Sequence, residues 1–451
     1  MNAFAYIVMF SWIPIIFFLF NRLPIRQAVI VAFIAAWLFL PLAEIKIVSG
    51  IPAFSKMSAT CYGILFATIV FDVKRFSSFQ FSWLDLPMLI YCITPFISSI
   101  DNGLGWYDGM SAGVAQAISW GVPYYLGRIY LNNLDGLRKL AMGILIGGLI
   151  YVPLCLYEVR TSPQLHHQLY GFSSNHFLQE IRYGGFRPEV FMESGLMVGN
   201  WMMTATLTAI WLWQADAIKQ IRGWRIEWLA GVLLLTCVLV KATGALVILA
   251  VGLTIMSSAK WLRNSLIVLV LISLISVYVY NGASGAFSGD QIISNISAVD
   301  TERAGSLKVR FDNEKILSEK ARQRVIFGWG GWGRNRLINH ATRKDDSITD
   351  SLWIIIFGTS GAVGLISWMA LNLLPVVRFV KLYPASVWLN YKVAPAAIIA
   401  ILLVLYMIDC LSNAMLNPIY TVMAGALTGL VVKSPEITNK AKNLRLSFTG
   451  R

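Results

Sequence analysis

The sequence predicts an all-α, polytopic integral membrane protein. Of the 451 residues, 57% are hydrophobic and only 13% are charged, which is more apolar than the core of a soluble domain requires. The apolar residues gather in long runs, of the length that a helix needs to cross the hydrocarbon core of a bilayer. The 37 Lys and Arg residues fall mainly in the breaks between these runs, where such residues orient helices toward the cytoplasm.

Thirteen apolar runs are candidates for membrane spans, and several are shortened or interrupted by Pro or Gly, so about 12–13 transmembrane helices are expected. The first run is expected to be a retained helix, because no basic region or cleavage pattern precedes Asn21. At Lys241 the sequence leaves open one long helix or two short ones. The runs are Ala3 to Phe20, Ala28 to Ala43, Ser58 to Val73, Trp83 to Ile100, Ala112 to Leu131, Leu140 to Tyr157, Phe191 to Trp213, Trp228 to Val240, Ala242 to Met256, Asn264 to Tyr280, Ser351 to Val377, Val393 to Leu411 and Pro418 to Val432.

The basic residues predict the orientation of the chain. Clusters such as Lys74 with Arg75 and Arg138 with Lys139 occupy alternate loops, whereas the short loops at 101–109 and 411–417 contain no Lys or Arg. Residues 1–432 then form a single transmembrane domain with two long outer loops, 158–190 and 281–350, and residues 433–451 form a basic cytoplasmic tail. Because topology accounts for most of the net charge of +14, nucleic acid is not an expected partner.

Arginines are concentrated in the two outer loops, where no orientation requirement explains them, since long loops are translocated largely regardless of charge. Arg182 and Arg187 lie in the first loop, and Arg303 and Arg310 in the second. Guanidinium groups bind phosphate oxygens in two-pronged fashion, so a lipid-linked phosphate or diphosphate is the candidate ligand. The alternative is contact with lipid headgroups, or ion pairs with the acidic residues Glu180, Glu189, Glu302 and Glu314.

Two residues of the second loop are candidates for a general base. Asp350 lies where the polar loop meets the apolar run beginning at Ser351; partial desolvation there makes a carboxylate a better base for a sugar hydroxyl. The alternative, which the sequence alone favours, is that Asp350 is the N-cap of the following helix. His340, ten residues upstream, is the second candidate.

Other features of the second loop point to a surface helix and to contact with sugars. Residues 306–322 have the charge spacing of a surface helix, on which Arg303, Arg310 and Glu314 share one face. Trp329 and Trp332, in the segment FGWGGWG, are suited to lie against sugar rings or to anchor in the membrane interface. That segment lacks a Walker pattern, so ATP hydrolysis is not supported.

No metal or cofactor is expected. The four His residues have no HxxxH or HxH spacing. The five Cys residues all lie inside apolar runs, without a short Cys-to-Cys spacing, and are expected to be small packing residues.

Four segments resemble the O-antigen ligase and polymerase superfamily of bacterial envelope enzymes, which are C-type membrane glycosyltransferases. They are SLKVRFDNEKIL, FGWGGWG, DSLWIIIFGTSGAVGL and, upstream, RYGGFRPEVFMESGLMVGN. The resemblance implies metal-independent transfer of an oligosaccharide from an undecaprenyl diphosphate carrier on the periplasmic face of the bacterial inner membrane. Its implied partners are the lipid-linked oligosaccharide, the bilayer, a flippase and a chain-length regulator.

The resemblance also implies roles for residues. Arg182 or Arg187 matches the diphosphate-binding Arg of the first loop and Arg310 that of the second, with Arg303 as a further candidate. In ligases the residue that assists the acceptor is typically a His, whereas this sequence has Asp350 at the corresponding place. That difference favours a polymerase that joins lipid-linked repeat units into exopolysaccharide or O-antigen.

Two alternatives stay open. One is a ligase that transfers finished glycan to lipid A core or to another acceptor. The other, from a different class, is a transporter or flippase for the same lipid-linked sugar. Transporters usually place ionisable residues within their helices, whereas the conspicuous charges here gather in the outer loops, with Arg128, Asp72 and Asp409 as exceptions near helix ends.

Overall fold

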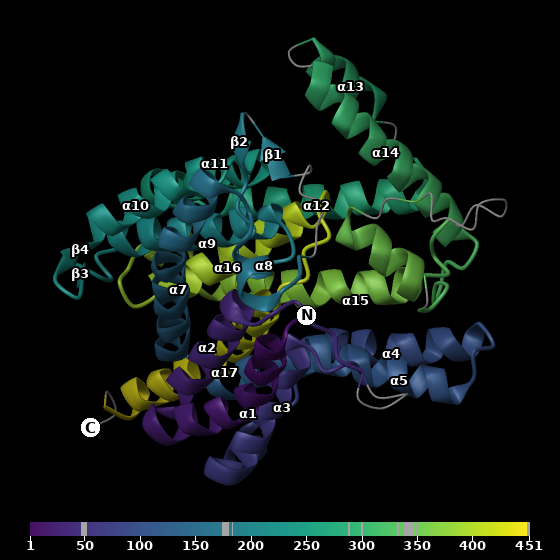
Figure 1. Ribbon diagram of the computed structural model, residues 1–451. Helices are drawn as coiled ribbons and strands as arrows, with labels where there is room; N and C mark the ends of the chain where they lie inside the picture. The colour runs from purple at the N-terminus through teal and green to yellow at the C-terminus, as the bar shows by residue number, and fades with distance from the viewer. Residues whose placement is uncertain are drawn as a thin grey trace.

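A computed structural model describes residues 1–46, 52–173, 180–182, 184–286, 289–298, 301–331, 333–337, 347 and 350–448. At residues 290–292, 296, 301–303, 306, 307 and 434–448 it describes the backbone alone. The described chain is predominantly helical (Figure 1). Its only strands form two short antiparallel hairpins, β1 (Ile181–Arg182) with β2 (Gly185–Phe186) and β3 (Gln220–Ile221) with β4 (Trp224–Arg225).

The α-helices are α1 (Ala3–Arg22), α2 (Ile25–Phe39), α3 (Lys56–Phe71), α4 (Leu86–Asp101), α5 (Trp106–Gln116), α6 (Val122–Tyr130), α7 (Leu134–Thr161), α8 (Leu165–Tyr170), α9 (Gly195–Gln214), α10 (Ile226–Leu239), α11 (Thr243–Ser257), α12 (Leu266–Ser284), α13 (Asp290–Ser297), α14 (Thr301–Arg322), α15 (Leu352–Leu382), α16 (Ala394–Asp409) and α17 (Pro418–Phe448). Short 3₁₀ segments are η1 (Val73–Ser78), η2 (Trp83–Asp85) and η6 (Ala385–Val387), and π turns are η3 (Ala117–Gly121) and η5 (Ser258–Leu262).

Many of these helices have the length and composition of membrane spans. In the described chain, six helical segments are long and apolar enough to cross a bilayer, and five more apolar helices are shorter. Large apolar side chains also remain exposed on the outside of the bundle, among them Ile7, Val70 and Ile366. Exposed apolar surface of this extent is a property of membrane proteins rather than of soluble monomers. The coarse prediction of an all-α membrane protein therefore agrees with the structure.

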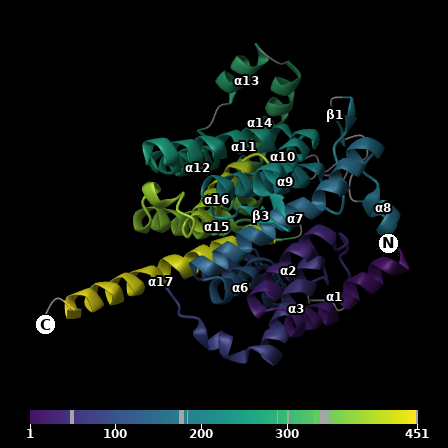
Figure 2. The same ribbon diagram turned by 90° about the vertical axis from the view of Figure 1, so that its left-hand side faces the viewer.

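The predicted runs all fall on helices, but several of their boundaries differ from the observed ones. Helices α5 and α7 begin at Trp106 and Leu134 rather than at Ala112 and Leu140, and α2 ends at Phe39 rather than at Ala43. The run around Lys241 is two helices, α10 and α11, and Lys241 lies between them with a φ of 59°. The run Ala112 to Leu131 is continuous from α5 through the π turn η3 to α6. At the other end of the chain, α17 extends past Val432 through Phe448, and Figure 2 shows its C-terminal part projecting from the bundle.

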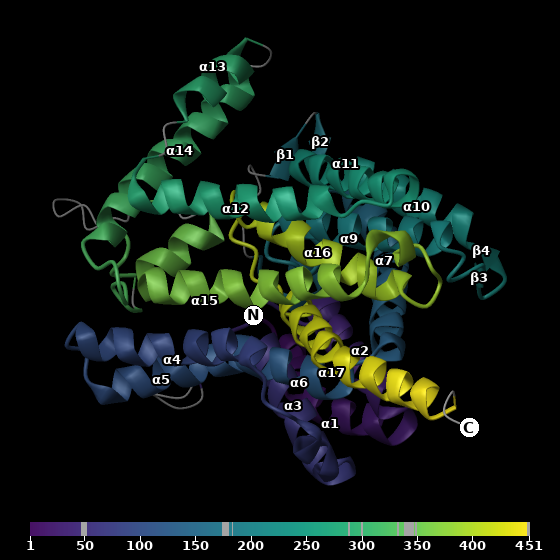
Figure 3. The ribbon, with the colours of Figure 1, turned by 180° about the vertical axis from the view of Figure 1, so that it is seen from behind.

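The two long predicted loops contain structure of their own. The second forms α13 and α14, which project from the bundle (Figures 1 and 3). The predicted surface helix at 306–322 is therefore correct, but it begins five residues earlier, at Thr301.

The two ends of the first loop are held together by the buried carboxylate of Glu158. It accepts backbone N–H bonds from Gln164 and Leu165 at one end of the loop and from Glu189 and Val190 at the other.

Helix α15 changes direction at Gly361, where φ is 64° and the backbone is not helical. The segment that follows α14 lies against this kink: the N–H of Trp329 donates to the Gly358 carbonyl at 2.8 Å, and the N–H of Ala362 donates to the Val325 carbonyl at 2.7 Å. A Cβ atom at Gly361 would collide with the Ile326 backbone. Glycine is therefore required here both for the positive φ and for the close approach.

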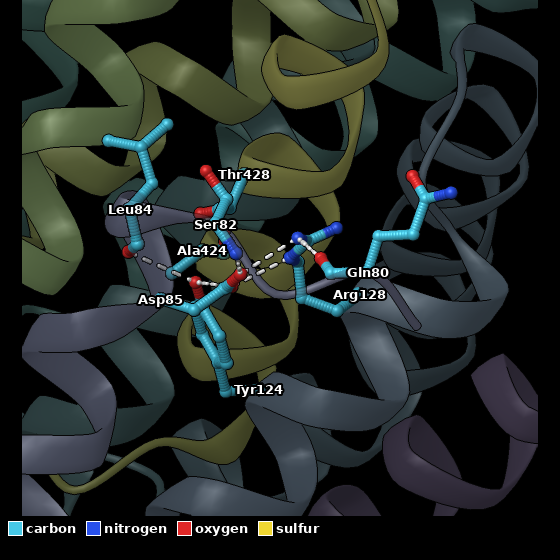
Figure 4. A network of polar contacts seen from close by, with 8 residues as sticks. All are labelled: Gln80, Ser82, Leu84, Asp85, Tyr124, Arg128, Ala424 and Thr428. Atoms are coloured by element: carbon cyan, nitrogen blue, oxygen red, sulfur yellow. Dashed lines mark hydrogen bonds and ion pairs between the residues drawn. The ribbon is translucent and has the colours of Figure 1, made fainter. Parts of the chain in front are cut away.

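A buried ion pair joins α6 to the start of α4 (Figure 4). Arg128 donates from Nε to Asp85 Oδ1 at 2.7 Å and from Nη2 to Asp85 Oδ2 at 2.8 Å. Tyr124 and the Ser82 N–H also donate to the carboxylate, and Arg128 Nη2 donates to the Gln80 carbonyl. The side chains of Arg128 and Asp85 are only 3% and 4% exposed, so Arg128 holds the fold together and does not line an open path for a transported substrate.

Candidate active site

The candidate site lies where α14 meets the start of α15. Arg310 Nε is 3.6 Å from Asp350 Oδ2, and the two side chains are 33% and 45% exposed. The distance is longer than that of a charge-assisted hydrogen bond, so the two groups form a loose, solvent-accessible ion pair. The structure thus brings together the two residues that the sequence proposed as a diphosphate ligand and a general base.

Asp350 is not the N-cap of α15, so the interpretation that the sequence alone favoured is wrong. The N-cap is Ser351, and it makes no side-chain capping bond. The N–H of Leu352 instead donates to the carbonyls of Cys410 and Asn413, at 3.1 and 3.2 Å. Backbone carbonyls just after α16 thus accept the hydrogen bond of the first N–H of α15. The Asp350 carboxylate is not used as a cap and lies beside Arg310.

Glu314 supports the start of α15 from one turn further along α14. It is buried and accepts a short hydrogen bond from the Ser351 hydroxyl and a bond of 2.8 Å from Tyr278. Its carboxyl also interacts electrostatically with Arg310. Glu314 therefore connects α12, α14 and α15 at the residue next to Asp350. The sequence indicated only that Glu314 shares a helix face with Arg310, because spacing along one helix says nothing about what another helix presents to it.

Burial raises the pKa of Glu314 above its ordinary 4.5, against the opposing effects of the Ser351 and Tyr278 hydrogen bonds and of the Arg310 charge. The folded protein then holds this proton more tightly than the unfolded chain, so the free energy of unfolding should fall as pH rises from about 4.5 through the raised pKa. We expect Glu314→Gln to flatten this slope. Thermal unfolding midpoints of both proteins between about pH 4 and pH 8 test it; parallel pH profiles would contradict it.

A second polar network lies beside the site, among α9, α16 and α17. Asp409 accepts hydrogen bonds from Asn413 at 2.7 Å and from Asn200 at 2.9 Å, and Tyr420 donates to the Asn200 side-chain oxygen at 2.6 Å. All four side chains are buried, and Arg310 interacts electrostatically with Asp409. Asn200 and Asn413 were not among the residues predicted to have a role. The signal that could have found them is an amide side chain within or next to an apolar run, where a polar group needs a partner.

The two arginines of the first outer loop have different surroundings. Arg187 is buried in an ion pair with Glu180, with contacts of 2.6 and 3.2 Å from Nε and Nη2. The alternative of ion pairing therefore holds for Arg187. Arg182 lies on β1 with an exposed side chain, and its carbonyl accepts a bond of 3.3 Å from Lys241. Of these two, Arg182 has the guanidinium that solvent reaches.

The remaining predicted site residues divide into two groups. Arg303 lies on α14, but only its backbone is described, and His340 and Trp332 lie outside the described residues. Trp329 is described: its Nε1 donates to the Lys320 carbonyl at 2.8 Å, and Lys320 Nζ lies 4.1 Å from the ring centroid. Because both contacts are made with Lys320, near the C-terminal end of α14, Trp329 fixes the loop to the end of that helix.

Within the described chain, no three His, Cys, Asp or Glu side chains are grouped as ligands for a metal ion. The fold and the site together define an all-α membrane protein with an arginine–carboxylate pair at a loop–helix junction. No model of a known protein family matches the sequence, and no curated protein matches it.

Proposed function

We propose that the protein polymerises undecaprenyl diphosphate-linked oligosaccharide repeat units into exopolysaccharide or O-antigen. The reaction is a metal-independent, inverting glycosyl transfer on the periplasmic face of the bacterial inner membrane, within a C-type glycosyltransferase architecture. The observation that carries the proposal is the pair of Arg310 and Asp350, at 3.6 Å and open to solvent. It joins a group suited to a leaving diphosphate and a group suited to an acceptor hydroxyl.

The two residues have complementary roles in this reaction. Arg310 exchanges the Asp350 carboxylate for oxygens of the lipid diphosphate, which guanidinium binds in two-pronged fashion. Asp350, released from the pair, accepts the proton of the acceptor hydroxyl as that oxygen attacks the anomeric carbon. The new glycosidic bond forms as the bond to the diphosphate breaks on the opposite face, which inverts the configuration. The developing charge on the leaving group is stabilised by Arg310.

One guanidinium does not neutralise a diphosphate, so further cations are required. Arg303, seven residues before Arg310 on α14, and the exposed Arg182 are the candidates. The lipid-linked substrate has to reach the outer leaflet, and the product has to stop growing at some length, which is why a flippase and a chain-length regulator are proposed as partners.

The proposal is tested with purified protein in lipid, incubated with an undecaprenyl diphosphate oligosaccharide and analysed for product length on a gel. A ladder of products is expected. A single transfer to an added acceptor would instead establish a ligase, and an intact substrate moved across the bilayer would establish a transporter.

The role of Arg310 is tested in the same assay. We expect Arg310→Ala to slow polymerisation by roughly a hundredfold to a thousandfold, the usual loss when one group that stabilises developing charge is removed. The matched control is Arg324→Ala, because Arg324 forms a similar exposed pair with Asp101 at 3.8 Å, with side chains 45% and 47% exposed. Equal rates for the two variants would contradict the assignment.

A further inference from the structure

The C-terminal part of α17 is a helical segment that the proposed reaction does not use. Residues 418–433 form the apolar part of this helix, and Val431 is still buried in the bundle. Beyond that point the helix continues through Phe448 and projects from the bundle (Figure 2). The segment 436–448 is therefore a helix that continues directly from the membrane-embedded part of the chain but is no longer surrounded by it.

The sequence of this segment is amphipathic at helical spacing. Its apolar residues Ile437, Ala441, Leu444 and Phe448 recur at intervals of four, three and four residues. On a helix with about 3.6 residues per turn, these four positions share one narrow face. The opposite face is polar apart from Leu446.

Basic residues border the apolar face. By their positions on the helix, Lys440 lies on one side of this face and Arg445 on the other, and Lys442 lies on the polar face. From 433 to 451 the chain has five Lys or Arg residues and one acidic residue, Glu436. Topology accounts for basic residues after a span, but it does not account for an apolar face. A helix with an apolar face and Lys or Arg beside it is typical of segments that lie in the membrane interface.

A helix of this composition requires support from outside itself. Thr438, Asn439, Asn443 and Ser447 have low helix propensity, and isolated helices shorter than about 12–15 residues are marginal in water. Figure 2 shows this part of α17 away from the bundle, so the bundle does not supply the support. The surface nearest to the end of a membrane-embedded helix is that of the bilayer.

Pro435 gives the helix a place to bend toward that surface. Proline has no backbone N–H, so residue 435 makes no helical hydrogen bond to the carbonyl of Val431. Sharp helix bends are usually found at proline. A bend here turns the segment 436–448 from the axis of α17 into the plane of the membrane.

We propose that residues 436–448 bind the surface of a membrane that contains anionic phospholipids. The face with Ile437, Ala441, Leu444 and Phe448 enters the interface, and the basic residues are attracted to the headgroups. Anionic lipid is the chosen occupant because its charge is opposite to that of the segment and because the chain enters the segment directly from the membrane. This binding is independent of the reaction proposed for the outer loops.

The test is hydrogen–deuterium exchange of the backbone amides at 437–448 in the full-length protein, with one copy in each lipid nanodisc. Discs of phosphatidylcholine alone are compared with discs that also contain phosphatidylglycerol. Both faces of a nanodisc are open to solvent, so the result does not depend on the orientation of the chain. Exchange should be at least about tenfold slower in the anionic discs, because each basic residue near such a surface adds to the attraction.

Salt provides a second measurement on the same samples. Raising the NaCl concentration from about 0.1 M to about 1 M shortens the screening length from about 10 Å to about 3 Å, so the protection in the anionic discs should be lost. Equal protection in the two kinds of disc would overturn the proposal, because the contact would not depend on lipid charge. Rapid exchange in both would overturn it as well.

Leu444→Ser and Leu446→Ser are a matched pair that tests the apolar face. The substitution is the same, and the two positions lie on opposite faces of the helix. Leu444→Ser should lose most of the protection in the anionic discs, and Leu446→Ser should keep it. Equal protection of the two variants would overturn the proposed face.

A second matched pair tests the charge. Lys440→Gln, Lys442→Gln and Arg445→Gln together should weaken the association by roughly a hundredfold and abolish the protection, since three attractive charges are lost. Lys440→Arg, Lys442→Arg and Arg445→Lys together keep the charge and should behave like wild type. Both proteins should unfold at the same temperature as wild type, because the segment projects from the bundle. Protection that survives in the Gln variant would overturn the proposal.

Discussion

Asp350→Asn is expected to slow polymerisation by roughly a hundredfold to ten-thousandfold, the usual contribution of a positioned general base. The amide keeps the shape of the side chain and can still lie beside Arg310, but it cannot accept the proton of the acceptor hydroxyl. Initial rates of ladder formation, with wild type and variant at equal folded concentration, measure the effect. The loss should appear in the rate at saturating substrate.

The control for this variant is Asp101→Asn. Asp101 and Asp350 have nearly the same exposure, 47% and 45%, and each lies in a loose pair with one arginine, at 3.8 and 3.6 Å. The two substitutions therefore remove the same charge from similar surroundings, and they differ in position relative to the start of α15. If Asp101→Asn lowers the rate as much as Asp350→Asn, a general loss of loop structure explains both, and Asp350 has no special role.

Arg128→Met should destabilise the protein by about 3–5 kcal/mol, because it leaves the Asp85 carboxylate buried without its cation. The matched control is Arg225→Met. Arg225 also forms a two-pronged pair, with Glu227, through contacts of 3.0 and 3.0 Å, but its side chain is 66% exposed. An exposed pair of this kind contributes little to stability, because solvent screens it. Unfolding in detergent, followed by tryptophan fluorescence, compares the two proteins.

A double variant separates the lost pair from lost packing. In Arg128→Met with Asp85→Asn, no charge stays buried, and the single oxygen of the introduced amide can keep one of the two bonds that Tyr124 and the Ser82 N–H donate to different oxygens of Asp85. The double variant is therefore expected to be more stable than Arg128→Met alone. Equal stability of Arg128→Met and Arg225→Met would show that burial of the pair in Figure 4 has no energetic consequence.

The sequence predicted the helices well because the hydropathy and charge spacing that indicate a helix lie within the helical segment itself. Apolar runs of membrane length give α1, α7, α12 and α15 directly, and charge spacing within one segment gives α14. The turn at Lys241 required the structure, because an apolar segment interrupted by a single Lys has the same composition whether it forms one helix or two. The need for glycine at position 361 likewise required the structure. It arises from the non-helical backbone there and from the segment after α14 that packs against it.

The candidate site was only partly predictable. Arg310 and Asp350 were selected by residue type and position, and the structure places them together. The capping interpretation of Asp350 failed because the carbonyls of Cys410 and Asn413, far away in the sequence, occupy the first N–H of α15. Arg187 and Arg182 were both selected because they are arginines of the first outer loop. The fold buries Arg187 in an ion pair with Glu180.

By itself, the sequence determined the all-α membrane class, the approximate spans, the two long polar segments and the concentration of arginine in them, since hydropathy and charge are properties of each segment alone. Only the tertiary structure decided which charges are paired and buried, such as Arg128 with Asp85, and which remain open to solvent, such as Arg310 with Asp350. These outcomes depend on contacts between helices that are distant in the chain. Such contacts set both the partner and the solvent exposure of each charged group, and these two factors determine the free energy of its charged form.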